Sequence, residues 1–239
     1  MAERKRAKHR AAADGSGKPA AGGPVWASLV SEPQTGVSVI TAAGTIVYLN
    51  AQAAEIFLGP RVTVEDATGA KLDALYPPEF ADERARLVRG VIERDQPVLF
   101  RAMWRGHQHL SWIYPIHAED GHTTADAQPQ PKVLVITRRT GGDAADAVMS
   151  DTGLERIDAG VINLGPLDIL SPRELVVLAL LGRGMSIKEA ARHLHRAPAT
   201  IETQRENIGK KLRLADRGEL VQLVQRVGLT IDDAERTAI

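Results

Sequence analysis

The C-terminal third of the chain repeats one pattern, in which a helix-start signal precedes apolar residues three and four positions apart. Ser171–Glu174 and Ser186–Glu189 are capping boxes, where serine accepts the glutamate N–H and the glutamate side chain accepts the serine N–H. Pro198 suits a first helical turn, and Asp216 suits an N-cap. The apolar stripes that follow are Leu175, Leu178, Ala179 and Leu181; Ile187, Ala190, Ala191 and Leu194; Ile201, Ile208 and Leu212; and Leu220, Leu223, Val224 and Val227. This spacing predicts four helices between Leu170 and Leu229.

The preceding part of the chain alternates apolar and polar residues with the period of two that is typical of strands. Val37–Ile40 and Ile46–Leu49 flank a turn at Gly44, and Asn50 can cap a helix over 51–58. A second helical pattern covers 79–93. Three further strands are predicted at 97–104, 107–116 and 132–138, and their alternating faces carry Val98, Phe100, Ala102 and Trp104 on the first and Leu110, Trp112, Tyr114 and Ile116 on the second.

The remaining segments lack a sustained apolar period. Residues 1–24 are rich in Arg, Lys, Ala, Gly and Pro, which predicts a disordered basic arm. Residues 141–166 are expected to form a flexible linker with at most a short helix at 144–149, and residues 230–239 a tail. The sequence therefore predicts a mixed α/β domain at 25–140 and a helical domain at 167–229.

Composition narrows the classes of function. The formal net charge is +0 and the chain has no cysteine, which excludes disulfides and thiolate metal sites. No apolar run reaches the length of a membrane span and no secretory signal begins the chain, so we expect a cytoplasmic protein without a membrane partner. Phosphate loops, nucleophile elbows and metal-protease signatures are also absent, which argues against an enzyme.

The helical segment resembles the LuxR/GerE-type helix-turn-helix of bacterial transcription regulators. The matching pieces are LSPRE at 170–174, GMSIKEAA at 184–191, TIET at 200–203 and IGKKL at 208–212. This resemblance implies a four-helix domain whose third helix enters the DNA major groove and whose fourth pairs with a second copy. On the fourth helix, the candidate dimer contacts are Val221, Val224 and Gln225.

The third helix leaves hydrogen-bonding and cationic side chains off its apolar stripe, which are the types that read base edges and hold phosphates. The candidate DNA-binding residues are Thr200, Glu202, Thr203, Gln204, Arg205, Glu206, Asn207, Lys210 and Lys211. The alternative is that the terminal lysines only complement the helix dipole. Five positions depart from the family pattern. Ala197 replaces a capping serine, Ala199 a basic residue and Gln204 a histidine, and Glu202 and Glu206 stand where base-contacting side chains, frequently lysine, are common.

The N-terminal domain resembles a PAS sensory domain, through GVSVITAAGTIVYLNAQAAEIFLG at 36–59 and HQHLSWIYPIHAED at 107–120. The fold class expected for the whole chain is therefore α+β: a PAS-like antiparallel sheet domain with short helices, then an all-α four-helix domain. Phe100, Trp104, Trp112 and Tyr114 could line a small-molecule cavity or form plain core. We predict no cofactor and no metal, because His107 and His109 have no third ligand at useful spacing.

Two hypotheses follow from these patterns. The first is a transcription regulator that couples sensory input to double-stranded DNA as a homodimer, with RNA polymerase as a further candidate partner. The second is an interaction module whose helix-turn-helix binds another regulatory protein in place of DNA. The patterns do not identify the signal, the operator or the direction of regulation.

Overall fold

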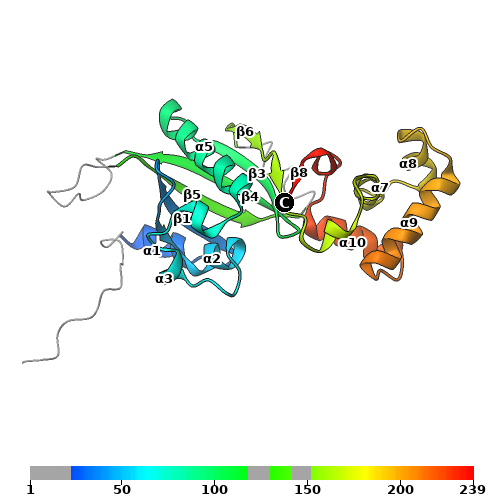
Figure 1. The fold of residues 1–239 in the computed structure, drawn as a ribbon, viewed down its shortest axis with the longest axis horizontal. Helices are drawn as coiled ribbons and strands as arrows, with labels where there is room; N and C mark the ends of the chain where they lie inside the picture. The colour runs from blue at the N-terminus through cyan, green and yellow to red at the C-terminus, as the bar shows by residue number, and fades with distance from the viewer. Residues whose placement is uncertain (1–22, 118–129, 142–151) are drawn as a thin grey trace, which may run out of the picture.

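The computed structural model describes residues 23–117, 130–141 and 152–239. A sheet with helices packed on it forms one part of the molecule, and the helices α7 to α10 lie beyond one end of that sheet (Figure 1). Within the described ranges, no helix is both long and apolar enough to cross a membrane. The predicted basic arm and the predicted short helix at 144–149 lie outside the described residues.

The sheet has the strand order β2-β1-β5-β4-β3-β6. Its strands are β1 (Thr35–Thr41), β2 (Ile46–Leu49), β3 (Val98–Trp104), β4 (His107–Ile116), β5 (Lys132–Arg139) and β6 (Glu155–Asp158). Every pairing is antiparallel except that of β3 with β6. The first five strands match the predicted ones to within two residues, and the α+β class, with a largely antiparallel sheet domain followed by four helices, is confirmed.

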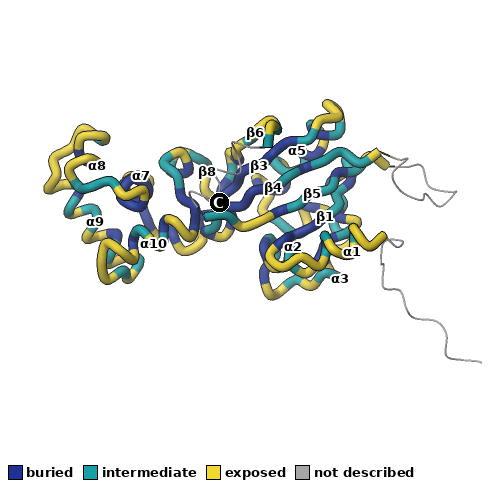
Figure 2. The backbone as a smooth tube through the Cα atoms, turned by 180° about the vertical axis from the view of Figure 1, so that it is seen from behind, coloured by how far each residue is buried: buried dark blue, intermediate teal, exposed yellow. Residues whose placement is uncertain are grey.

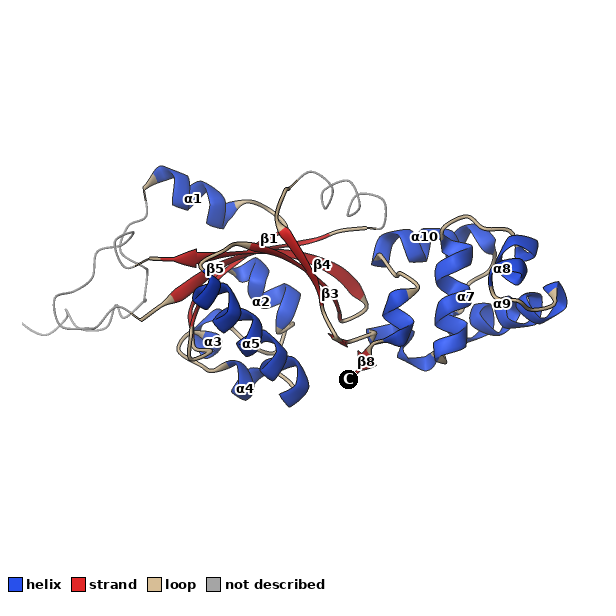
Figure 3. Cartoon of the chain, turned by 90° about the horizontal axis from the view of Figure 1, so that it is seen from above, coloured by secondary structure: helices blue, strands red, loops and turns tan. Residues whose placement is uncertain are grey.

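Helices cover one face of this sheet, while α1 (Pro24–Ser31) lies on the other (Figure 3). The covering helices are α2 (Ala51–Phe57), α3 (Val64–Ala67), α4 (Leu72–Leu75) and α5 (Pro78–Arg94). Between them and the sheet lies a buried cluster that includes Val91 of α5, Phe100 of β3 and Val133 of β5. Asn50 caps α2 as predicted, because its side chain accepts the N–H of Ala53 at 2.9 Å.

The second part of the structure is the predicted four-helix domain. It contains α7 (Pro172–Gly182), α8 (Ile187–His193), α9 (Pro198–Leu212) and α10 (Arg217–Val227). Both serine capping boxes form, and Asp216 caps α10. Ala197 makes no side-chain cap, as its missing hydroxyl requires. Figure 2 shows α7 largely buried at the centre of this domain and much of α8 and α9 exposed.

Short regular elements form within the described residues of the predicted linker and of the predicted tail. Within 152–166, β6 extends the sheet beside β3, and β7 (Val161–Ile162) follows it. The C-terminal residues form the 3-10 helix η3 (Asp232–Glu235) and β8 (Thr237–Ala238), which pairs with β7. These elements are short and their partners are remote in sequence, so local apolar periodicity gives no sign of them.

Candidate DNA-binding interface

Helix α9 is fixed by its apolar side and offers its polar side to solvent. Ile201 and Ile208 are fully buried in the cluster that α7, α8 and α10 share. Among the predicted contact residues, Thr200, Thr203, Glu206, Asn207, Lys210 and Lys211 are exposed, and Glu202, Gln204 and Arg205 are half-buried. A rigid helix with an outward polar face is the arrangement by which helix-turn-helix domains read the major groove.

Lys211 is tied to its own domain. Its Nζ lies 2.7 Å from Oε2 of Glu174, the residue that completes the cap of α7. Burial alone would raise the pKa of Glu174, but the bonds from Lys211 and Ser171 hold that pKa below its ordinary value. Lys211 therefore joins the end of α9 to the start of α7, whereas Lys210 has its side chain exposed.

Other side chains of α9 are also held within the helix. Nε and Nη2 of Arg205 donate to Oε1 of Glu202 at 2.9 and 2.7 Å. Because each side chain is held by the other, both are less available to contact DNA than unpaired exposed side chains are. The hydroxyl of Thr203 donates to the carbonyl of Ala199 at 3.0 Å, so its methyl group and lone pairs face outward. A base contact by Thr203 would use those lone pairs or that methyl group.

A basic surface around α9 extends beyond the predicted contact residues. Arg192 ends α8, Arg196 precedes α9 and Arg213 follows it, and all three are exposed. Residues 168–228 contain eleven Arg and Lys against seven Asp and Glu, a formal charge of +4 within a chain of net charge +0. A charge count by predicted domain would have found this asymmetry.

The predicted dimer contacts divide into core and surface. Val224 is only 4% exposed and packs within its own domain, where a Cβ added at Gly182 would lie 2.3 Å from the Val224 Cβ. Its assignment to a dimer surface is therefore wrong, because this side chain fills the contact between α7 and α10. Val221 is half-buried and Gln225 is exposed, so both remain on the outer side of α10.

The four aromatic residues predicted to line one cavity lie on two faces of the sheet. Leu99 pairs with Trp112 across β3 and β4, and paired residues point to the same face. Trp112 therefore shares the face of Leu99, and so does Tyr114, two residues further along the strand. Phe100 and Trp104 alternate with Leu99 and point to the helix-covered face, so the four residues cannot line one cavity.

The helix-covered face holds an aromatic cluster with buried polar groups. The rings of Trp104 and Phe80 lie 4.0 Å apart, and Tyr76 adjoins both. The guanidinium of Arg84 stacks 4.2 Å from the Phe80 ring centre and 4.1 Å from that of Phe100. Burial lowers the pKa of Arg84 to about 10, and the aromatic faces stabilise its charge.

His109 lies in the same interior and is 1% exposed. Its Nε2 lies 3.2 Å from the carbonyl of Trp104, to which a neutral imidazole can donate, and its Nδ1 has no hydrogen-bond partner. Burial lowers the pKa of His109 to about 3, so the ring is neutral near pH 7. Within the described residues, no group of three or more His, Cys, Asp and Glu side chains could hold a metal ion.

His109 should make stability depend on pH. An unfolded histidine has a pKa of about 6.5, so lowering the pH below that value protonates the unfolded chain and leaves the folded one neutral. Between pH 7.5 and pH 5.5 this costs the folded state about 1.4 kcal/mol. His109→Gln, which keeps a donor for Trp104, should lose that part of the pH dependence in urea unfolding. Equal pH dependence in the two proteins would contradict this prediction.

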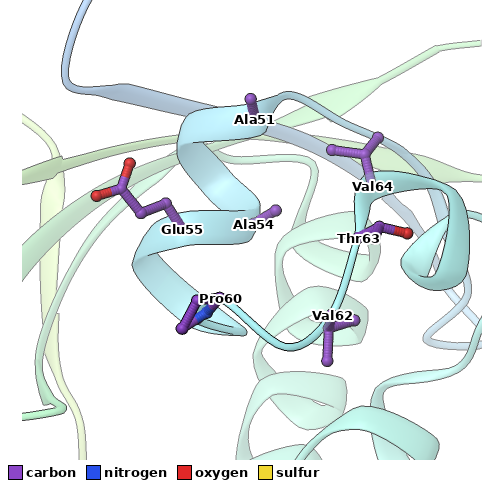
Figure 4. A pocket seen from close by; sticks show the side chains of 8 residues that line it. Ala51, Ala54, Glu55, Pro60, Val62, Thr63 and Val64 are labelled. Carbon is purple, nitrogen blue, oxygen red and sulfur yellow. The ribbon is translucent and has the colours of Figure 1, made fainter.

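An open groove of about 450 Å³ lies between α2 and α3. Ala54 of α2 points across it toward the segment that carries Thr63 and Val64, whereas the Glu55 side chain points away from that segment (Figure 4). A second groove of about 300 Å³ lies between α5 and β6 and includes Phe100. Of the four predicted cavity residues, Phe100 alone lines either of these two grooves.

Comparison with known proteins places the helical part in a family. The model of bacterial regulatory proteins of the luxR family matches residues 168–224. Nodulation protein W of Bradyrhizobium diazoefficiens is 30% identical over 99 residues, which cover 39% of this chain and 44% of that protein. The transcriptional regulatory protein MctR of Rhizobium johnstonii is 31% identical over 125 residues, which cover 47% of this chain and 54% of that protein. The chain thus spans about half the length of these relatives.

Two solved structures are similar at lower levels. A Vibrio cholerae VqmA–ligand–DNA complex is 20% identical and covers 87% of this chain and 89% of that chain, with a TM-score of 0.44. A PAS domain from Colwellia psychrerythraea is 16% identical and covers 48% of this chain and 92% of that chain, with a TM-score of 0.36. Neither similarity bears on what this chain binds. Residues 168–224, which contain α7 to α9 and most of α10, are thus similar to the luxR family of bacterial regulatory proteins.

Proposed function

We propose that this protein is a bacterial transcription regulator that binds double-stranded DNA through α9. The observation that carries the proposal is α9 itself, which is anchored in a luxR-family domain by Ile201 and Ile208 and presents polar and cationic side chains outward. The local charge of +4 supports the approach of this domain to a phosphate backbone. The matched relative MctR is described as a transcriptional regulatory protein.

Each side chain of α9 has a role in this proposal. Thr203, Glu202 and Glu206 lie near base edges, where glutamate accepts from cytosine N4. Gln204, Asn207 and Thr200 contribute hydrogen bonds, and the exposed Lys210 holds a phosphate. Arg205 and Lys211 reach phosphates only if they leave Glu202 and Glu174, so we assign the main phosphate contacts to Lys210 and to the exposed arginines around α9.

The protein acts as a homodimer in this proposal, with α10 meeting a second copy through Val221 and Gln225. Two copies let one protein occupy two half-sites on DNA. The sensory domain supplies the input, through a small molecule held on the helix-covered face of the sheet beside Arg84 and His109. No chemical step is assigned to the chain, and its site of action is the cytoplasm, where bacterial DNA lies.

Binding of the full chain to a library of genomic fragments, with salt titration, tests this function. The expected result is selective retention of a few fragments, with an affinity that falls steeply between about 50 and 200 mM salt. Sedimentation of the retained complexes should show two copies per site. Absence of selective binding at low salt would overturn the proposal. Stable capture of another regulator in place of DNA would favour the interaction-module alternative.

A further inference from the structure

Arg101 of β3 is the centre of a buried polar contact between the two parts of the chain. It is 1% exposed and lies on the sheet face opposite the helices. Its Nη1 and Nη2 donate to the two carboxylate oxygens of Asp233 at 2.9 and 2.8 Å. Nε donates to Oε1 of Gln108 at 2.6 Å, and Nη2 also approaches the carbonyl of Gly228 at 3.3 Å. A planar guanidinium is thus bonded along both of its edges.

Asp233 is equally enclosed. Its side chain is fully buried, and its Oδ2 accepts from the N–H and the hydroxyl of Thr230 at 2.8 and 2.9 Å. Arg236 lies 3.1 Å from its Oδ1. A buried pair in which one charge is removed leaves the other without compensation, so this contact depends on both partners. The pair joins residues 132 positions apart in the sequence.

Close packing surrounds the ion pair. Gly228 ends α10 with φ +71, and a Cβ added there would lie 2.6 Å from the Gln108 Cβ. Met103 of β3 is fully buried in the same apolar cluster as the core of the four helices. Beyond η3, β8 pairs with β7, and Asn163 donates to the carbonyl of Ile239 at 2.8 Å. Residues 228–239 and Arg101 are called the clasp below.

We propose that the clasp fixes the orientation of the DNA-binding helices on the sensory sheet, and that its opening is how the sensory domain alters DNA binding. Arg101 is flanked along β3 by Phe100 and Ala102, which point to the helix-covered face. The Phe100 ring contacts Arg84 of α5. A movement of side chains on that face displaces β3, whose Arg101 binds Asp233. The strand therefore connects the two parts physically. The DNA-binding half of this inference rests on the proposed function.

The chain lacks cysteine, which allows site-specific labelling of the full-length protein. Ala43→Cys in the turn before β2 and Lys188→Cys in α8 place two dyes at exposed positions, one in each part. Single-molecule energy transfer without DNA then measures the distance distribution between the parts. The labelled parent should show one narrow distribution. Asp233→Asn, which leaves Arg101 with only the more distant carboxylate of Asp158 at 3.9 Å, should add a second population at longer distance.

Gly228→Ala tests the clasp with every charge retained. Its new methyl group is wedged against Gln108, so it too should produce the longer-distance population. Gly184→Ala is the matched control, because Gly184 also has positive φ, at +90, but has open space around it. This control should keep the parent distribution. Circular dichroism establishes whether each variant is folded. If Asp233→Asn lost its fold, the distance distribution of Gly228→Ala would decide whether the clasp holds the two parts together.

The DNA arm of the experiment uses the same proteins. Asp233→Asn and Gly228→Ala should shift the apparent Kd in the same direction by about tenfold, a coupling typical of linked sites, and Gly184→Ala should not. Parent-like distance distributions in both clasp variants would overturn the clasp. Opened distributions with an unchanged Kd would overturn its role in DNA binding. Failure of all the proteins to bind DNA would overturn the proposed function and leave the clasp itself supported by the distances.

Discussion

Asn50→Ala should lower the free energy of unfolding of the sheet domain by about 3 kcal/mol. Asn50 is 7% exposed and makes four bonds with its side chain. It accepts the N–H groups of Val37 and Ala53, each at 2.9 Å, and donates to the carbonyls of Val30 and Thr35, each at 2.9 Å. Alanine removes the side chain that joins α1, β1 and α2. Because water reaches this site poorly, the four backbone groups are left without a hydrogen-bond partner.

Urea unfolding followed by tryptophan fluorescence measures this effect, since Trp26, Trp104 and Trp112 are the three tryptophans of the chain and all lie in the sheet domain. Asn50→Asp is the informative control. It keeps both acceptor bonds and loses both donor bonds, so its stability should fall between those of the parent and of Asn50→Ala. An alanine variant within about 0.5 kcal/mol of the parent would contradict the structural role of Asn50.

Lys210→Ala combined with Arg213→Ala should weaken DNA binding about tenfold or more and make its salt dependence shallower. Both side chains are exposed at the end of α9, where they are free to meet phosphates. Loss of two phosphate contacts reduces the slope of log K against log salt by about 1.8. Fluorescence anisotropy with one selected fragment and one unrelated fragment at several salt concentrations measures both quantities, and the two fragments should lose affinity together.

Two single variants separate phosphate contact from other effects of charge. Arg226→Ala removes an exposed cation from the last turn of α10, near His107 of the sheet, and should leave the salt slope unchanged. Lys211→Ala should act mainly through the stability of the helical domain, because it breaks the bond to Glu174. If Lys210→Ala with Arg213→Ala bound DNA like the parent, the assignment of the end of α9 to phosphates would be wrong.

Local signals in the sequence determined α2, α5, the four helices α7 to α10 and most strands, but not α1, α3 or α4. The bonds of a capping box join residues three positions apart, so Ser171 with Glu174 and Ser186 with Glu189 could be recognised without any tertiary contact. The alternation of apolar residues likewise located β3 and β4. The outward face of α9 followed from its apolar stripe, since Ile201 and Ile208 must face the core.

Only the tertiary structure decided which surfaces those elements cover. Alternation along β3 and β4 places Phe100 and Trp112 each on the apolar face of its own strand. Only the pairing register shows that these two faces lie on opposite sides of the sheet. Val224 looked available on α10 until its packing against Gly182 was visible. Lys211 meets Glu174 across 37 positions and Arg101 meets Asp233 across 132. Such partners are chosen by how the chain folds in space, and no local period encodes them.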